Sequence, residues 1–128
     1  MNLPEKLKYT KSHEWVLIEG ETATMGITEF AVEQLGDVTL VECPQAGDKV
    51  VAGDSMGTIE SVKAVSDLYC PISGEIADAN AALEDEPEKV NDDCYGDGWI
   101  VKITLGDDAS EEDLMDATAY EEYLDSLD

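Results

Sequence analysis

The chain has 128 residues, a formal net charge of −24 and no arginine. Its length predicts one domain (1–128), and no run of about 18 apolar residues predicts a membrane span. Because so acidic a chain cannot neutralise a phosphate backbone or an anionic membrane surface, we expect neither a nucleic-acid nor a membrane partner.

The beginning of the chain and its cysteines indicate the compartment. Residues 1–6 have neither the apolar core of a signal peptide nor an arginine-rich transit pattern. Cys43, Cys70 and Cys94 are odd in number and widely spaced, which predicts free thiols in a reducing environment. We expect a cytoplasmic protein of bacterial type, with a mature mitochondrial protein as the alternative. The acidity fits steering toward basic partner surfaces, or a halophilic origin.

Residues 9–27 predict a β-hairpin, in which Gly20 lies in the turn between two β-rich arms. Trp15 is expected to be a core anchor. His13 is the only histidine and is interpreted as a structural hydrogen-bonding residue near the start of a strand. One histidine leaves almost no material for a zinc site or a His-based triad, so we expect neither a metal site nor a catalytic group.

A short helix and a strand follow this hairpin. Thr28 is expected to cap the helix and Gly36 to end it, and residues 38–43 read as a strand that ends at Pro44. The apolar face of the helix would consist of Ala31, Val32 and Leu35.

Two glycine corners come next. The spacing Pro44-x-x-Gly47, followed by Gly53, resembles the turn shared by lipoyl and biotinyl carrier domains. This spacing predicts two tight turns in which glycine allows a positive φ. Pro71-x-x-Gly74 repeats the first corner and indicates two quasi-equivalent halves.

Between these corners, the segment 57–68 predicts a second hairpin with Lys63 at its tip. Read outward from Lys63-Ala64, the residues mirror one another in the pairs Val62 and Val65, Ser61 and Ser66, Glu60 and Asp67, and Ile59 and Leu68. A two-residue loop of Lys63-Ala64 would place these residues opposite one another, although Lys-Ala is not a favoured turn pair. Ile59 and Leu68 then face the core, while Glu60 and Asp67 form a destabilising like-charge pair.

The rest of the chain is predicted to form short elements. Residues 80–83 and 87–90 read as helical turns and 99–103 as a strand. The C-terminal segment 110–127 is acidic and helical, with one helix starting near Leu114 and a second capped by Thr118.

Lys63 is the only basic residue between Lys49 and Lys89. Its neighbours are carboxylates, which favour the ammonium form over the neutral amine that a nucleophilic lysine needs. The amine is therefore interpreted either as an ordinary solvated turn lysine or as a site that another enzyme acylates. Lipoamide and biotin are the group carriers attached in this way.

The segment Glu60–Asp67 resembles the lipoylation site of the H proteins of the glycine cleavage system, and on it the chain is identified as a member of that family. The runs Ser12-His13-Glu14-Trp15 and Gly96-Asp97-Gly98-Trp99 are also typical of these proteins. The resemblance implies a mainly β barrel-sandwich hybrid of two antiparallel sheets with short peripheral helices. It also implies a core at about 9–105 and a C-terminal helical segment at about 110–127.

The resemblance implies a carrier that is not an enzyme. Lipoate would be joined by an amide to Lys63. The carrier would take an aminomethyl group from the pyridoxal-phosphate glycine decarboxylase (P protein) to the tetrahydrofolate-dependent aminomethyltransferase (T protein). Dihydrolipoyl dehydrogenase (L protein) would reoxidise it. A lipoate–protein ligase or an octanoyl or lipoyl transferase would modify it, and we expect a monomer.

Further residues are expected to serve the modifying enzyme and, because the aminomethyl cargo would hydrolyse in water, to shield the loaded arm near the hairpin. Recognition of the attachment site is expected to involve the residues that flank Lys63: Glu60, Ser61, Val62, Ala64, Val65, Ser66 and Asp67. Docking of the loaded arm is expected at Ser12, Glu14, Ile27, Phe30, Leu35 and Asp67, with Val65 as a further part of the apolar wall.

Other functions remain open from the sequence. A biotinyl carrier flanks its lysine with methionines, and here the neighbours are Val62 and Ala64. A lipoyl domain of another dehydrogenase complex usually has an aspartate before the lysine and a long linker. The remaining alternatives are an unmodified interaction module and an H-like protein that mainly donates or relays lipoate.

Overall fold

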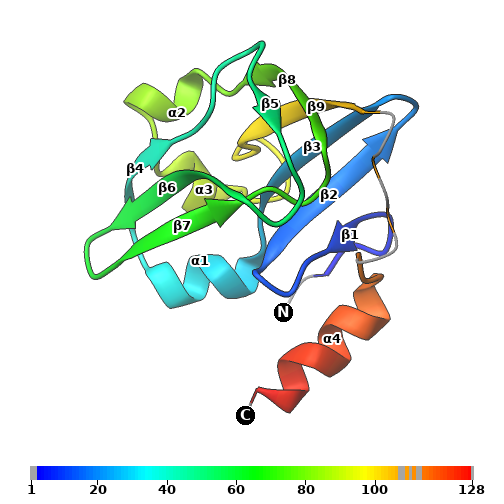
Figure 1. The fold of residues 1–128 in the computed structure, drawn as a ribbon. Coiled ribbons are helices and arrows are strands. Elements are labelled where there is room, and N and C mark those ends of the chain that lie inside the picture. Colours follow the sequence, from blue (N-terminus) through cyan, green and yellow to red (C-terminus); the bar gives the residue numbers. More distant parts are fainter. Residues whose placement is uncertain (1–2, 107–108, 110, 112–113, 128) are drawn as a thin grey trace.

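The computed structural model describes residues 3–106, 109, 111 and 114–127. Within them the strands form two antiparallel sheets, one in the order β1-β2-β3-β9-β8-β5 and one in the order β4-β6-β7 (Figure 1). The strands are β1 (Lys8–Tyr9), β2 (Glu14–Glu19), β3 (Thr22–Ile27), β4 (Val38–Glu42), β5 (Lys49–Val50), β6 (Ser55–Ser61), β7 (Val65–Tyr69), β8 (Gly74–Ala79) and β9 (Val101–Leu105). The helices are α1 (Glu29–Leu35), α2 (Ala82–Asp85), α3 (Lys89–Asp92) and α4 (Ala117–Ser126). The predicted mainly β architecture is confirmed, and no helix among these residues is long and apolar enough to cross a membrane.

The first hairpin and the first helix form as their sequence predicts. Strands β2 and β3 pair from Glu14 and Ile27 to Glu19 and Thr22, around a turn in which Gly20 has φ of 64°. Thr28 caps α1 by accepting a hydrogen bond from the backbone N–H of Ala31, an interaction worth about 1 kcal/mol. Helix α1 ends at Gly36, whose φ of 78° is readily adopted only by glycine.

The core lies between the two sheets. Its buried side chains come from both sheets and include Val16, Met25, Ile59, Leu68 and Ile103. The backbones also approach closely, because a Cβ atom built at Gly57 would lie 2.1 Å from the carbonyl oxygen of Glu42. Glycine is therefore required at this point of β6 for β4 to pair with it.

The two Pro-x-x-Gly corners use their glycines for different reasons. Gly47 and Gly53 have φ of 97° and 91°, as the expectation of positive φ at these corners requires. Gly74 begins β8, and a Cβ atom there would lie 2.1 Å from the Thr104 carbonyl oxygen. The repeat in the sequence thus reflects a left-handed turn in one half and close strand pairing in the other.

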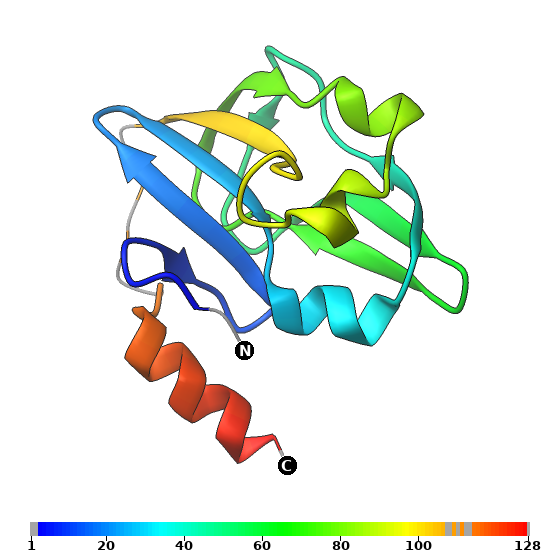
Figure 2. The ribbon, with the colours of Figure 1, turned by 180° about the vertical axis from the view of Figure 1, so that it is seen from behind.

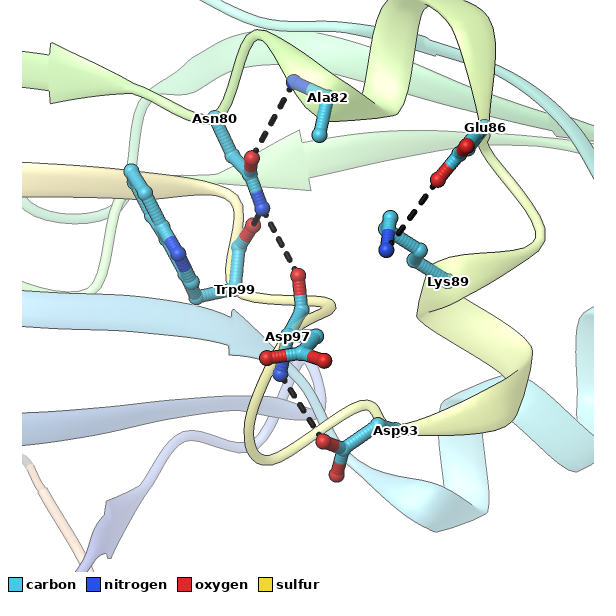
Figure 3. A network of polar contacts seen from close by, with 7 residues as sticks. All are labelled: Asn80, Ala82, Glu86, Lys89, Asp93, Asp97 and Trp99. Carbon is cyan, nitrogen blue, oxygen red and sulfur yellow. Dashed lines mark hydrogen bonds and ion pairs between the residues drawn. The ribbon is translucent and has the colours of Figure 1, made fainter.

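The segment between β8 and β9 is held by side chains that bond the backbone (Figure 3). Asn80 donates to the carbonyl oxygens of Asp97 and Trp99 at 2.9 and 2.8 Å and accepts from the N–H of Ala82. Nearby, Lys89 and Glu86 form an ion pair at 3.1 Å. Asn80 thus ties the start of α2 to the loop before β9, and α2 and α3 each begin two residues later than the predicted helical turns.

The C-terminal segment differs from its prediction. Helix α4 is capped by Asp116, whose side chain accepts from Ala119, and Thr118 lies inside the helix. Leu114 belongs to no helix, while Met115 bridges to Tyr9 through two backbone hydrogen bonds of 2.8 Å. Residues 110, 112 and 113, on which the expected earlier helix also depends, lie outside the described residues.

Helix α4 lies at the periphery beside β1, away from the tip of the β6–β7 hairpin (Figures 1 and 2). Tyr120 attaches it. The Tyr120 ring stacks on Tyr9 with a centroid distance of 4.8 Å, and its hydroxyl lies 2.8 Å from both His13 Nδ1 and Thr28 Oγ1. His13 therefore makes the structural hydrogen bond expected of it, to a residue 107 positions away.

Candidate attachment site and adjoining cavity

Lys63 lies in the exposed turn that joins β6 to β7. The N–H of Ser61 donates to the Ala64 carbonyl oxygen at 2.8 Å, and the Ser61 hydroxyl accepts from the N–H groups of Lys63 and Ala64. The two central residues of the turn are therefore Val62 and Lys63. The predicted two-residue loop of Lys63-Ala64 is wrong by one position.

The strand register is shifted accordingly. Glu60 pairs with Val65, Ile59 with Ser66 and Thr58 with Asp67. The predicted like-charge pair of Glu60 and Asp67 is absent, so its destabilisation does not arise. The shift is by two residues and keeps every side chain on its predicted face, because sheet faces alternate with period two. Ile59 and Leu68 are buried as predicted.

The outer face of this hairpin carries apolar side chains in solvent. Val62 is 70% exposed and Val65 is 67% exposed, and Leu40 lies on the same face, paired with Glu60. The Tyr69 hydroxyl reaches Asp67 Oδ2 at 3.4 Å. Ser61, Ala64 and Ser66 complete the set of predicted recognition residues: Ser61 ends β6, Ala64 lies in the turn and Ser66 is the second residue of β7.

The turn contacts the end of α1. The N–H of Val62 donates to the Asp37 carbonyl oxygen at 3.0 Å. The Lys63 side chain lies against Gly36, where a built Cβ atom would be 3.2 Å from Lys63 Cε and 3.8 Å from Nζ. Both views show the chain between α1 and β4 passing beside the hairpin (Figures 1 and 2).

A cavity of about 300 Å³ lies between the hairpin, β2 and α1. Its lining includes most of the residues expected to dock the arm: Ser12, Glu14, Ile27, Leu35, Val65 and Asp67. Phe30 does not line it. The Phe30 ring lies against the His13 ring, with centroids 4.5 Å apart, because Phe30 projects from a different side of α1 from Leu35.

The rest of the lining was not predicted to dock the arm, although Ala64 and Ser66 were predicted to take part in recognition of the attachment site. These residues are His13, Ala31, Gln34, Ile59, Ala64 and Ser66. Helical periodicity could have found two of them, since Ala31 lies one turn before Leu35 and Gln34 lies one turn after Ala31. His13 and Ile59 come from other elements and carry no comparable signal.

Glu14 is the buried acid of this cavity and is 2% exposed. Its Oε1 accepts hydrogen bonds from the hydroxyls of Thr10, at 2.8 Å, and Ser12. Burial raises the pKa of the Glu14 carboxyl to about 7, and hydrogen bonds from Ser12, Thr10 and the Tyr69 backbone oppose that rise. Near neutral pH this carboxyl can therefore hold a proton or pair with a cation.

Burial also shifts the pKa of His13 and of Cys70. Burial lowers the pKa of His13 and raises that of the Cys70 thiol to about 11. Cys70 is 3% exposed, and its Sγ donates to the Ile72 carbonyl oxygen, so it is a core residue as predicted.

Comparison with known proteins gives consistent results. The family model "Glycine cleavage H-protein" matches residues 7–127. A glycine cleavage system H protein from Bacteroides thetaiotaomicron is 52% identical over 94% of this chain and 95% of its own length. Another, from Chromohalobacter salexigens, is 55% identical over 94% of this chain and 92% of its own. A crystal structure of a glycine cleavage system H protein from Mycobacterium marinum has a TM-score of 0.88 at 38% identity, covering 96% of this chain and 99% of that one.

Proposed function

Because the chain belongs to the glycine cleavage H-protein family, whose members are lipoyl carriers in glycine catabolism and not enzymes, we propose that Lys63 is its lipoyl attachment site. The observation that carries this proposal is the position of Lys63 in an exposed turn that is held by hydrogen bonds on both sides. Among the described residues, the one ion pair within 4 Å joins Lys89 to Glu86. No carboxylate of these residues therefore lies within 4 Å of the Lys63 amine.

The bound lipoyl group supplies a disulfide that takes up an aminomethyl group and, after its transfer, is reoxidised from the dithiol. The chain's own residues present this group and shield it. A turn at the end of two paired strands keeps the root of the arm in one place, while the four-carbon lysine stem lets its far end move between partners.

The cavity beside the hairpin is suited to receive the loaded end of the arm. Ile27 and Leu35 would form its apolar inner wall and exclude water from the cargo, and Val65, which is 67% exposed, would add to this wall at the surface. The carboxylates of Glu14 and Asp67 would hold the ammonium group of the cargo. Pairing with that cation would favour ionised Glu14 and so offset part of its desolvation.

The partners follow from membership of the glycine cleavage system. We propose that the P protein loads this carrier, the T protein unloads it and the L protein reoxidises it, after a lipoate–protein ligase or a transferase has attached the group. The net charge of −24 would steer the chain toward basic surfaces around the active sites of these partners. The relatives named above are bacterial proteins, and we propose a cytoplasmic location.

Glycine–bicarbonate exchange tests the proposal. With P protein and pyridoxal phosphate, the lipoylated chain should support exchange of labelled bicarbonate into glycine. Lys63→Arg should abolish exchange, whereas Lys89→Arg, a change in an exposed ion pair, should leave it at the wild-type rate. Exchange by the Lys63→Arg chain would overturn the assignment of the attachment site.

A second experiment tests the cavity. Loss of cargo from the loaded wild type in buffer should be slower than loss from the double variant Glu14→Ala/Asp67→Ala, because the variant has no carboxylate at either position. Equal rates would remove the proposed docking by charge and leave the carrier function standing.

A further inference from the structure

One side chain bonds both ends of the segment 36–38, which connects α1 to β4. Asn91 of α3 donates from Nδ2 to the Gly36 carbonyl oxygen at 2.8 Å and accepts on Oδ1 from the Val38 N–H at 2.9 Å. These two bonds use opposite ends of the amide, so only an asparagine side chain in this orientation satisfies both backbone groups. Asn91 is half-buried, where a lost bond is not fully replaced by water.

The middle residue of the same segment holds the attachment turn. The carbonyl oxygen of Asp37 accepts from the N–H of Val62, the residue before Lys63. The Lys63 stem lies across Gly36, which also bonds Asn91. A continuous set of contacts therefore runs from α3, through three residues at the end of α1, to the turn that carries the amine.

We propose that Asn91 is a positioning residue for acylation of Lys63. The inference rests on the proposed function of Lys63 as the attachment site, and it adds a residue 28 positions away in the sequence. Asn91 fixes the segment 36–38, and this segment fixes the turn through Val62 and presents a flat glycine surface to the lysine stem.

Asn91 would affect acylation through the population of the turn conformation that the acylating enzyme can bind. An acylating enzyme accepts the turn in one conformation, and its apparent affinity falls in proportion to the population of that conformation. Removal of two hydrogen bonds from the segment loosens the backbone bond from Val62 to Asp37 and the neighbouring pairing of Val38 with Ser61. We expect the Michaelis constant for the acceptor chain to rise about fivefold, with kcat nearly unchanged.

The reaction to be measured is ATP-dependent. A lipoate–protein ligase joins lipoate to AMP, releasing pyrophosphate. The Lys63 Nζ then forms an amide bond to the lipoyl carboxyl carbon, the bond from that carbon to the AMP oxygen breaks, and the amine gives up a proton.

The chain offers a matched control. Asn80 is also half-buried and also bonds backbone groups at both ends of its amide, but it holds the loop before β9 and does not touch the hairpin (Figure 3). Asn80→Ala should therefore cost similar stability and leave acylation within about twofold of wild type. Asn91→Asp is a second test, since it matches asparagine in size and loses the donor to Gly36.

The experiment compares the four full-length chains as acceptors for a purified ligase with lipoate and ATP, and follows amide hydrogen exchange of Val62 by NMR. Asn91→Ala and Asn91→Asp should raise the Michaelis constant and speed exchange at Val62, whereas Asn80→Ala should change neither. If the wild type is acylated at Lys63 but Asn91→Ala and Asn80→Ala have equal Michaelis constants, this inference is overturned and the proposed function stands. Absence of acylation at Lys63 in the wild type would remove the proposed function, and this inference with it.

Discussion

The burial of Glu14 leads to a specific pH dependence of stability. In the unfolded chain its carboxyl has the ordinary pKa of 4.5, and in the folded protein burial raises the pKa to about 7. The folded state therefore binds more protons than the unfolded state between these values, and the free energy of unfolding falls as pH rises through this window. Because each tenfold change in proton affinity is worth about 1.4 kcal/mol, the full change is about 3 kcal/mol.

Glu14→Gln removes this contribution, since the amide does not ionise. Its oxygen can still accept from Ser12 and Thr10, which limits the loss of other contacts. Urea unfolding of both chains at intervals from pH 4.5 to pH 8 gives the difference in stability at each pH. His13 titrates in both chains, so its effect largely cancels in this difference.

Relative to wild type, the free energy of unfolding of Glu14→Gln should rise by about 3 kcal/mol between pH 4.5 and pH 8. Glu33→Gln, a change at an exposed position on α1, should follow the wild-type profile. If the difference in free energy of unfolding between wild type and Glu14→Gln stays constant across this pH range, the account of Glu14 as a buried acid with a raised pKa is refuted.

Three further predictions concern the scaffold. Tyr120→Phe removes one buried and one partly buried hydrogen bond and should destabilise the protein by about 1 to 3 kcal/mol in urea unfolding, whereas Tyr123→Phe should change stability by less than about 0.5 kcal/mol. Gly57→Ala should destabilise by more than about 2 kcal/mol, because its Cβ would collide with the backbone of β4; an unchanged midpoint would contradict the close approach. Cys70 and Cys94 should resist alkylation at pH 8 until urea is added, while the partly exposed Cys43 reacts first, and mass spectrometry of the native protein would expose any other order.

The sequence predicted the elements near Lys63 better than their register. Alternation of apolar residues assigned Ile59 and Leu68 to the core face, and this assignment is confirmed. The near-palindrome suggested a pairing that the structure does not adopt, because symmetry in the sequence does not determine which two residues form the turn. The Ser61 side chain bonds the turn backbone and Asp37 bonds Val62, and these contacts select the observed register.

Contacts between elements that lie far apart in the chain could not be predicted from the sequence. Half of the residues that line the cavity were predicted to dock the arm, yet Phe30 was misplaced because the helical face that meets the hairpin depends on how α1 packs. Likewise, Thr118 has the pattern of a cap, but Asp116 takes that role once Met115 pairs with Tyr9. The hydrogen bonds from Asn91 to the end of α1 join residues more than 50 positions apart, and no local pattern announces them.

A tryptic mass map of the chain after incubation with ligase, lipoate and ATP tests the attachment of lipoate to Lys63 most directly. Trypsin does not cleave after an acylated lysine, so residues 50–89 should appear as one peptide, heavier by a single lipoyl group. Recovery of unmodified peptides 50–63 and 64–89 from a chain that supports full glycine–bicarbonate exchange, or the added mass on any other lysine, would contradict the account.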